Sequence, residues 1–342
     1  RAYRRGEISV AAFKRIEDRA VDDAIALQER VGLDVIADGE QRRASFLGSL
    51  LDATTGLERS KTVTKPWHEP DGRVTELSLG LVVTHKLIPR RTLAGEEYVY
   101  ARARARKPVK IALPSPMMLS MFWSPEAARD AYRDPFELFA DGAAVIRAEI
   151  AELAQLGCEY IQIDAPELAT LTDPEASRAI YEQNGIDAKR LLGEGLELLN
   201  SLADAPGVNF GLHLCRGNND GRWLAQGGYE AISKEVFRRA TRYSALLLEY
   251  DDARSGGFAP LADVPRDKLV VLGLVSTKKA AMESAAELSA RIDDAARYFP
   301  REQLALSPQC GFASGVHGNP ITEAVQEAKL RLVAEVAHRA WP

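Results

Sequence analysis

The stretch from Gly211 to Asn218 contains two side chains that bind soft metals, at the end of an apolar run. Its residues His213 and Cys215 are two positions apart, and residues with this spacing on a strand point to the same face. An imidazole and a thiolate together favour zinc, because calcium and magnesium prefer oxygen ligands. An isolated pair of this kind is more often a buried cysteine and a hydrogen-bonded histidine. The metal interpretation therefore depends on further ligands elsewhere in the chain.

Short buried strands alternate with amphipathic helices along most of the sequence. Apolar runs predict strands at 33–37, 109–113, 160–164, 208–212, 245–249, 269–273 and 304–306. Apolar residues spaced three or four apart predict helices at about 9–30, 135–156, 188–202, 229–239, 282–298 and 322–339. Gly32 follows the first helix as its stop signal. Alternation of this kind indicates a parallel sheet covered by helices.

Seven strands, with a helix before the first of them, predict an α/β fold of the (β/α)8 TIM barrel type whose first strand lies upstream of Arg1. We expect a single barrel domain over residues 1–342, with a hairpin-rich insertion at about 45–106. The competing architecture is an open, doubly wound sheet. No Gly-x-Gly-x-x-Gly follows any of the strands, so a nucleotide site at a switch point has no support.

Barrel enzymes place their active sites at the carboxyl ends of the strands. The residues that follow the apolar runs are Glu40, Ser115, Asp164, His213 with Cys215, Glu249, Lys278 and Cys310. Each has an ordinary alternative, such as a solvated acidic loop for Glu249, a helix cap for Asp164 and simple burial for Cys310. Together, one histidine, two cysteines and one glutamate predict a tetrahedral zinc site. Cys158 lies at the start of its strand, and we assign it to packing.

Such a site is suited to thiol activation. A free thiol has a pKa of about 8.5, whereas a thiol bound to zinc is deprotonated. Two thiolates and a carboxylate outweigh the charge of the ion, so the site is a poor Lewis acid for hydrolysis but keeps a bound thiolate nucleophilic. A catalytic site must also offer a position to substrate. Glu249 is the hardest ligand, and we expect the sulfur of the substrate to displace it.

Composition excludes several classes of protein. The 342 residues are 46% hydrophobic and 27% charged, with a net charge of −5, which argues against disorder and against nucleic-acid binding. No stretch has the length and apolarity of a transmembrane helix, and no signal peptide is recognisable at the start, so we expect a cytoplasmic protein without membrane contact. Three widely spaced cysteines do not suggest a disulfide framework. The sequence does not indicate an oligomeric state.

Four segments resemble the catalytic half of the cobalamin-independent methionine synthases, most closely their short, single-barrel bacterial homologues. These segments are 38–42 (DGEQR), 161–166 (IQIDAP), 213–218 (HLCRGN) and 307–312 (SPQCGF). The resemblance implies zinc-dependent methyl transfer from methyltetrahydrofolate to the thiol of homocysteine. By position, it implies that His213, Cys215, Glu249 and Cys310 bind zinc, and that Glu40 and Asp164 bind the amino group of homocysteine. We further expect Ser115 to contact substrate, and Asp164 and Lys278 to act in catalysis.

Three departures from the family concern the methyl donor. Pro114-Ser115-Pro116 stands where the family has a tryptophan that stacks on folate, and Val275-Ser276-Thr277-Lys278 where it has a proposed acid histidine. The amino-terminal half of the long enzymes has no counterpart here. Trp123 is an alternative stacking surface, although packing is its expected role. A thiol alkyltransferase using another electrophile, such as an epoxide opened with the help of Lys278, is therefore an alternative function. A non-catalytic, zinc-stabilised barrel and a uroporphyrinogen-type decarboxylase are the others.

Overall fold

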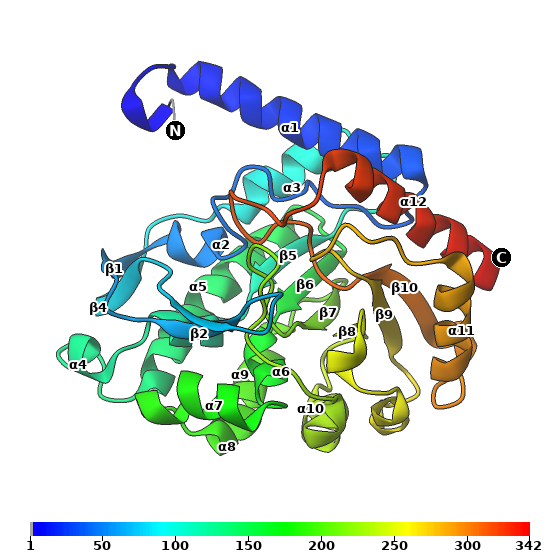
Figure 1. The fold of residues 1–342 in the computed structure, drawn as a ribbon. Helices are drawn as coiled ribbons and strands as arrows, with labels where there is room; N and C mark the ends of the chain where they lie inside the picture. Colours follow the sequence, from blue (N-terminus) through cyan, green and yellow to red (C-terminus); the bar gives the residue numbers. More distant parts are fainter. Residues whose placement is uncertain (1–2) are drawn as a thin grey trace.

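The computed structural model describes residues 3–342, and a parallel sheet of six strands forms its centre (Figure 1). The strands are β5 (Ile111–Pro114), β6 (Tyr160–Asp164), β7 (Asn209–Leu214), β8 (Ala245–Glu249), β9 (Leu269–Val275) and β10 (Leu304–Pro308). Strands that follow one another in sequence are neighbours in the sheet, and every pair is parallel. Parallel neighbours require a crossover, which the intervening helices supply. The expected α/β class and six of the seven expected strands are confirmed.

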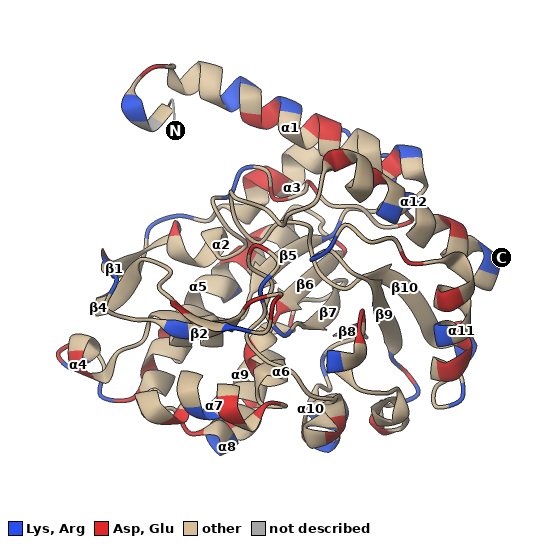
Figure 2. Cartoon of the chain, in the orientation of Figure 1, with Lys and Arg blue, Asp and Glu red and all other residues tan. Residues whose placement is uncertain are grey.

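Helices cover the sheet and connect its strands. They are α1 (Val10–Val31), α2 (Gly48–Leu51), α3 (Ala94–Arg102), α4 (Pro125–Ala128), α5 (Pro135–Gln155), α6 (Pro166–Thr170), α7 (Pro174–Ile180), α8 (Ala188–Arg190), α9 (Leu196–Leu202), α10 (Ser233–Arg239), α11 (Ala285–Ala295) and α12 (Glu323–Ala340). Charged side chains lie mostly on these helices and on loops, and few lie on the sheet (Figure 2). None of the helices within residues 3–342 has both the length and the apolarity needed to cross a membrane.

Three expected helices are shorter or divided. The segment 188–202 is split into α8 and α9 by a π-helical turn at Leu191–Gly195, and the helix expected from 229 begins at Ser233 after a short 3-10 turn. The helix expected at 282–298 is α11, and its start is fixed by a capping box in which Ser284 and Glu287 bond to each other's backbone N–H. Periodicity alone misses such boundaries because local hydrogen bonds set them.

Helix α1 has the predicted extent and the predicted ends. Ser9 caps its first turn by accepting a hydrogen bond from the Ala12 N–H at 3.2 Å. Gly32 ends it in the left-handed conformation (φ 89°), where it donates to carbonyls of the last turn. The carboxyl-terminal part of α1 lies beside α12 and over α3, while its amino-terminal turns extend beyond the body of the protein (Figure 1).

The prediction of a strand at 33–37 is wrong. Within this segment only Ile36 makes a sheet contact, a parallel bridge to Val109 just before β5. The backbone of the next residue, Ala37, bonds instead to the side chain of Gln28 on α1, which donates to the Ala37 carbonyl at 2.7 Å and accepts from its N–H at 2.9 Å. The Gln28 side-chain amide thus satisfies the two backbone hydrogen-bonding groups of Ala37 that a neighbouring strand would otherwise pair.

The ring of a complete barrel is not closed by strand pairing in residues 3–342. The sheet begins at the Ile36 bridge and ends at β10, whose outer edge pairs with no strand of the described chain. Helix α12 packs against β10 at this side. The strands expected from the sequence therefore form a continuous parallel arc, and the pairing that would complete eight strands is not made within it.

The segment between Ile36 and β5 carries two antiparallel strand pairs, one of them a hairpin (β2–β3) inserted between the strands of the other. β1 (Thr54–Arg59) pairs with β4 (Leu81–Pro89), and β2 (Lys65–His68) pairs with β3 (Val74–Leu77). His68 at the end of β2 forms a further bridge with Trp223, in the loop that follows β7, and the two rings stack with centroids 5.9 Å apart. The β2–β3 hairpin is thereby attached to the loop after the His213 strand.

Candidate metal centre and thiol site

The carboxyl ends of the strands gather the predicted site residues on one side of the sheet. Asp164 and Glu249 are the last residues of β6 and β8; Ser115 and Cys215 follow β5 and β7 directly; Lys278 and Cys310 lie in the loops after β9 and β10; and Glu40 follows the Ile36 bridge. The β6–β7 register sets Asp164 opposite His213. Parallel strands bring distant parts of a chain together in this way because all of them end on the same side.

His213, Cys215 and Cys310 form a compact group whose ligand atoms all lie within 4.8 Å of one another. The two sulfur atoms are 3.8 Å apart, too far for a disulfide, in which sulfurs are about 2.05 Å apart. Two sulfurs each about 2.3 Å from a tetrahedral zinc ion would be separated by about 3.8 Å. The observed separation therefore matches two ligands of one zinc ion.

The imidazole of His213 is oriented for metal binding. Its Nδ1 is 3.1 Å from the Leu247 carbonyl of β8, which fixes the ring with Nδ1 protonated as the donor. Its Nε2 is buried and makes no hydrogen bond to any residue in 3–342. A buried nitrogen without a partner is costly, and a metal ion shared with the two sulfurs would satisfy it. These three residues fit zinc by donor type, spacing and burial.

The electrostatics of this group favour a cation beside sulfur. A hydrogen bond from Cys215 lowers the pKa of the Cys310 thiol well below its usual range, and the same contact raises the pKa of Cys215. Burial alone would lower the pKa of His213, but the adjacent Cys310 raises it to about 9. The positive charges of His213 and Lys278 also stabilise the thiolate form of Cys310. A thiolate is the form of cysteine that binds a metal cation.

Glu249 lies outside this compact group. Its carboxylate is fully buried, and both oxygens are engaged: Oε1 accepts from Lys278 Nζ at 2.9 Å and Oε2 from the Arg216 N–H at 2.7 Å. Burial alone would raise the pKa of Glu249, but the charges of Lys278 and Arg216 outweigh it and lower that pKa to about 2. The pKa of Lys278 is raised because its attraction to Glu249 and Asp251 exceeds its own burial cost. The expected fourth ligand is therefore an ionised carboxylate bound to the expected catalytic lysine.

Glu40 occupies a strained turn at the edge of the site. It follows Gly39 and has a φ of 53°, a left-handed conformation that few residues other than glycine adopt. Its N–H donates to Asp38 Oδ1 at 2.9 Å, and its carboxylate lies 3.3 Å from Arg43 Nη1. Burial is the main cause that raises the pKa of Glu40 to about 7, and Arg43 opposes it while Asp164 adds to it. This turn holds the carboxylate toward the other acidic residue of the site.

Asp164 is held by a hydrogen-bonded chain inside the sheet. Gln162 donates to Asp164 Oδ1 at 2.6 Å, and Lys110 Nζ donates to Gln162 Oε1 at 2.6 Å. Burial raises the pKa of Asp164, whereas His213 lowers it. Because the Asp164 carboxylate raises the pKa of Glu40, and both groups are buried, a cationic group between them would stabilise both as carboxylates.

Ser115 has a local structural role. Its hydroxyl accepts a hydrogen bond from the Met117 N–H at 3.1 Å and caps the 3-10 helix Pro116–Phe122, and the residue is completely buried. Its N–H bonds to the Asp164 carbonyl at 2.8 Å, which ties β5 to β6 at the site. A direct contact between Ser115 and a substrate stays a prediction.

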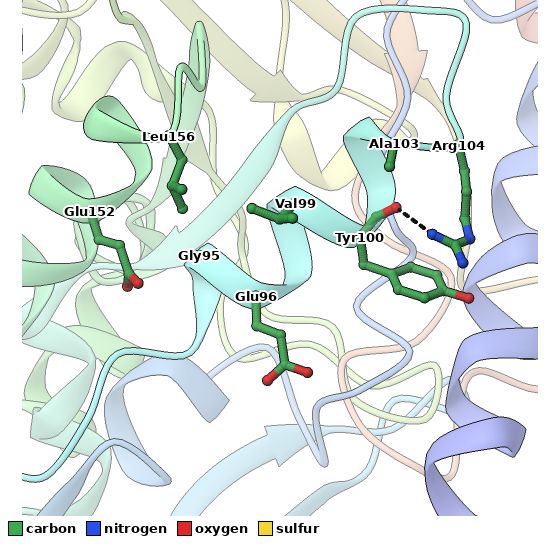
Figure 3. Close-up of a pocket in the computed structure, with 8 residues that line it drawn as sticks. All are labelled: Gly95, Glu96, Val99, Tyr100, Ala103, Arg104, Glu152 and Leu156. Carbon is green, nitrogen blue, oxygen red and sulfur yellow. Dashed lines mark hydrogen bonds between the residues drawn. The ribbon is translucent and has the colours of Figure 1, made fainter.

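Two residues assigned to packing are buried and do not belong to the three-residue group. Cys158 is 2% exposed and is a free thiol before β6. Trp123 is also 2% exposed, and its ring N–H donates to the Asn184 carbonyl at 2.9 Å. An outer depression between α3 and α5 includes none of the predicted ligands in its lining (Figure 3); it is lined by Gly95, Glu96, Val99, Tyr100, Ala103, Arg104, Glu152 and Leu156.

Three supporting residues of the site were missed from the sequence: Arg43, Lys110 and Gln162. Gln162 had a usable signal, because a polar residue two positions before Asp164 in an otherwise apolar strand must share its face. Arg43 belongs to the polar run that follows the Ile36 bridge. Its side chain is almost fully buried and pairs with Glu97 at 2.6 Å as well as with Glu40. Its pairing with Glu97 on α3 depends on tertiary structure alone.

Comparison with known families identifies the chain. A family model described as the catalytic domain of cobalamin-independent synthase matches residues 1–338. The chain belongs to this family. Among curated relatives, the uncharacterized protein YxjG of Bacillus subtilis is 33% identical over 346 residues, covering 98% of this chain and 88% of YxjG. Nearly the same match is found with YxjH of the same organism, also 33% identical.

A longer relative carries an enzyme name. The 5-methyltetrahydropteroyltriglutamate–homocysteine methyltransferase of Mycobacterium tuberculosis is 27% identical over 312 residues, which cover 91% of this chain but 37% of that enzyme. The present chain thus corresponds to a little over a third of the long enzyme.

Solved structures agree in fold. A B12-independent methionine synthase from a Shewanella species, in complex with selenomethionine, has a TM-score of 0.75 at 19% identity and covers 97% of this chain and 90% of its own. A putative vitamin-B12-independent methionine synthase from Listeria monocytogenes has a TM-score of 0.71 at 25% identity and covers 99% and 91%. Family membership and fold are thereby established together, and the predicted family resemblance is confirmed.

Proposed function

We propose that the protein is a zinc-dependent methyltransferase that methylates the thiol of homocysteine or a similar small thiol. The observation that carries this proposal is the group His213, Cys215 and Cys310, with sulfurs 3.8 Å apart and a buried Nε2 free of other partners in the described chain. When bound there, zinc would hold the substrate sulfur as a thiolate at neutral pH. Membership of the cobalamin-independent synthase family agrees with this chemistry.

The two carboxylates on the other side of the site fit the amino group of the substrate. Glu40 and Asp164 each carry a pKa raised by burial, and repulsion from the Asp164 carboxylate raises the pKa of Glu40 further. An ammonium group between them would form charge-assisted hydrogen bonds and remove this repulsion. The chain's own residues would thus bind the substrate by its amine and set its sulfur toward His213 and the two cysteines, so that positioning supplies part of the rate enhancement.

We propose a methyl donor from the name of a relative and not from a folate-binding site in this chain. The M. tuberculosis relative is named for a methyltetrahydropteroyltriglutamate donor, but this chain spans 37% of its length. Trp123 is buried and packed, and Lys278 is paired with Glu249, so neither is free to stack on a donor or to protonate it. A methyltetrahydropteroyl compound is the first donor to test, and other methyl or alkyl donors form the comparison.

One experiment tests the acceptor and the donor together. Purified protein is assayed for bound zinc, and X-ray absorption at the zinc edge is recorded before and after addition of homocysteine. We expect one additional sulfur in the zinc shell, together with methionine in the product mixture by mass spectrometry when methyltetrahydrofolate is present. An unchanged shell would identify a closed structural zinc site instead. Product formed only from an epoxide or another alkyl donor would favour the alkyltransferase.

A further inference from the structure

Lys278 is buried beside the metal group but is not one of its ligand types. It lies three residues after β9, and in the described part of the chain its Nζ has one hydrogen-bond acceptor, Glu249 Oε1 at 2.9 Å. A lysine is almost never fully buried unless it is paired. Because this ammonium is hydrogen-bonded to Glu249 and attracted to Asp251 beside a candidate site for a metal cation, its position requires an explanation beyond general stability.

The carboxylate of Glu249 is placed next to the metal group without joining it. Its second oxygen accepts from the N–H of Arg216, the residue directly after Cys215. Arg254 Nη2 lies 3.8 Å from Glu249 Oε1 and 3.9 Å from the Asp251 carboxylate, so a second cation supports this arrangement. In this structure Glu249 therefore lies in a cationic cradle formed by Lys278, the Arg216 N–H and Arg254, next to the predicted zinc ligand Cys215.

A buried carboxylate cannot leave a metal ion without a new partner. Taking one member of a buried charge pair away is strongly unfavourable, because the remaining charge has neither water nor a counter-ion. The cradle of Lys278 and the Arg216 N–H supplies both hydrogen bonds that a displaced Glu249 carboxylate would need.

We propose that Lys278 is a positioning residue that receives the Glu249 carboxylate when a substrate thiolate takes the fourth place beside His213, Cys215 and Cys310. This inference rests on the proposed function. In the exchange, the substrate thiol loses its proton to water and its sulfur gains the position that Glu249 gives up. Glu249 remains ionised and pairs with the Lys278 ammonium, so no buried charge is left unpaired.

The test compares Lys278→Met with Lys279→Met, a matched control because Lys279 is the adjacent residue and is exposed. Zinc affinity is measured by competition with a chromophoric chelator, and homocysteine affinity by titration of the zinc-loaded protein. We expect Lys278→Met to keep or strengthen zinc binding, because Glu249 loses its alternative partner, and to weaken homocysteine binding about tenfold or more. Lys279→Met should change neither affinity.

A merely structural role for Lys278 gives the opposite result. Residues that support metal ligands typically cost about 10–100-fold in metal affinity when they are replaced, and such a loss of zinc from Lys278→Met would overturn the proposal. The zinc edge spectrum of Lys278→Met should also keep its oxygen ligand at homocysteine concentrations that replace it by sulfur in the wild type.

The Glu249→Gln background makes the assignment specific. If Lys278 acts through Glu249, then adding Lys278→Met to Glu249→Gln leaves homocysteine affinity unchanged, whereas a further loss contradicts the proposal. The double variant removes both buried charges, so it also serves if Lys278→Met alone does not fold. The wild-type protein tests the proposed function separately from the role of Lys278. If the zinc shell of the wild type never takes up the homocysteine sulfur, the proposed function is rejected, regardless of the results with the variants.

Discussion

The two sides of the candidate site are built in different ways. On the sulfur side, His213 and Cys215 lie at the end of β7 and Cys310 lies in the loop after β10, and strand order brings their ligand atoms within 4.8 Å of one another. On the carboxylate side, Glu40 sits in a left-handed turn beside Arg43, and Asp164 depends on Gln162. Sheet geometry is sufficient for the first side. The second is a balance of buried charges, and the substrate ammonium would complete it.

Breaking the sulfur side should have the largest effect. Replacing Cys310 by Ser removes a thiolate ligand, so we expect loss of most bound zinc and of all measurable methyl transfer. Zinc content by elemental analysis and product formation by mass spectrometry are the measurements. Cys158→Ser is the control, because that thiol is buried outside the three-residue group and should leave zinc content unchanged. Full activity of a zinc-free Cys310→Ser protein would refute the metal mechanism.

Breaking the carboxylate side should have a smaller and more selective effect. Glu40→Gln and Asp164→Asn each remove one charge-assisted bond to the substrate amine, so we expect kcat/KM for homocysteine to fall about 10–100-fold while zinc stays bound. A thiol of the same length without the amino group is the matched comparison. Its kcat/KM should hardly change in either variant. An equal loss for both thiols would show that these carboxylates act on the metal group rather than on the amine.

The prediction with the smallest expected effect on zinc binding and methyl transfer concerns a buried acid close to the carboxylate side. Glu167 on α6 is 1% exposed, and burial raises its pKa to about 8. In the unfolded chain this side chain has the ordinary glutamate pKa of 4.5, so between pH 4.5 and about pH 8 the folded state holds up to one proton more than the unfolded state. The free energy of unfolding should therefore fall with rising pH by up to about 1.4 kcal/mol per unit from this group.

Glu167→Gln should remove that contribution, because a glutamine does not titrate. Urea unfolding between pH 5 and 8 measures the slope, and Glu182→Gln, at a nearby exposed residue, is the control that should keep the wild-type slope. If Glu167→Gln has the same slope as the wild type, then Glu167 is ionised in the folded protein despite its burial.

Much of the fold could be predicted because its signals are local. The limits of α1 follow from Ser9, from apolar spacing and from Gly32, and β6 has the limits that its apolar run predicts. The segment around Ile36 could not be read in this way. Its apolar residues look like a strand, but the hydrogen bonds of Ala37 go to Gln28 on a different element. Apolar pattern reports burial, whereas strand pairing depends on which backbone lies alongside.

By itself, the sequence determined the parallel α/β arrangement and the residues that end its strands, because periodicity and strand polarity are properties of the local chain. It therefore also placed His213, Cys215 and Cys310 on one side of the sheet. Only the tertiary structure decided the state of Glu249. The sequence pattern grouped this residue with the predicted zinc ligands, whereas the folded chain pairs it with Lys278. Ion pairs between loops depend on distances and desolvation that arise only when the elements pack, so no spacing in the sequence encodes them.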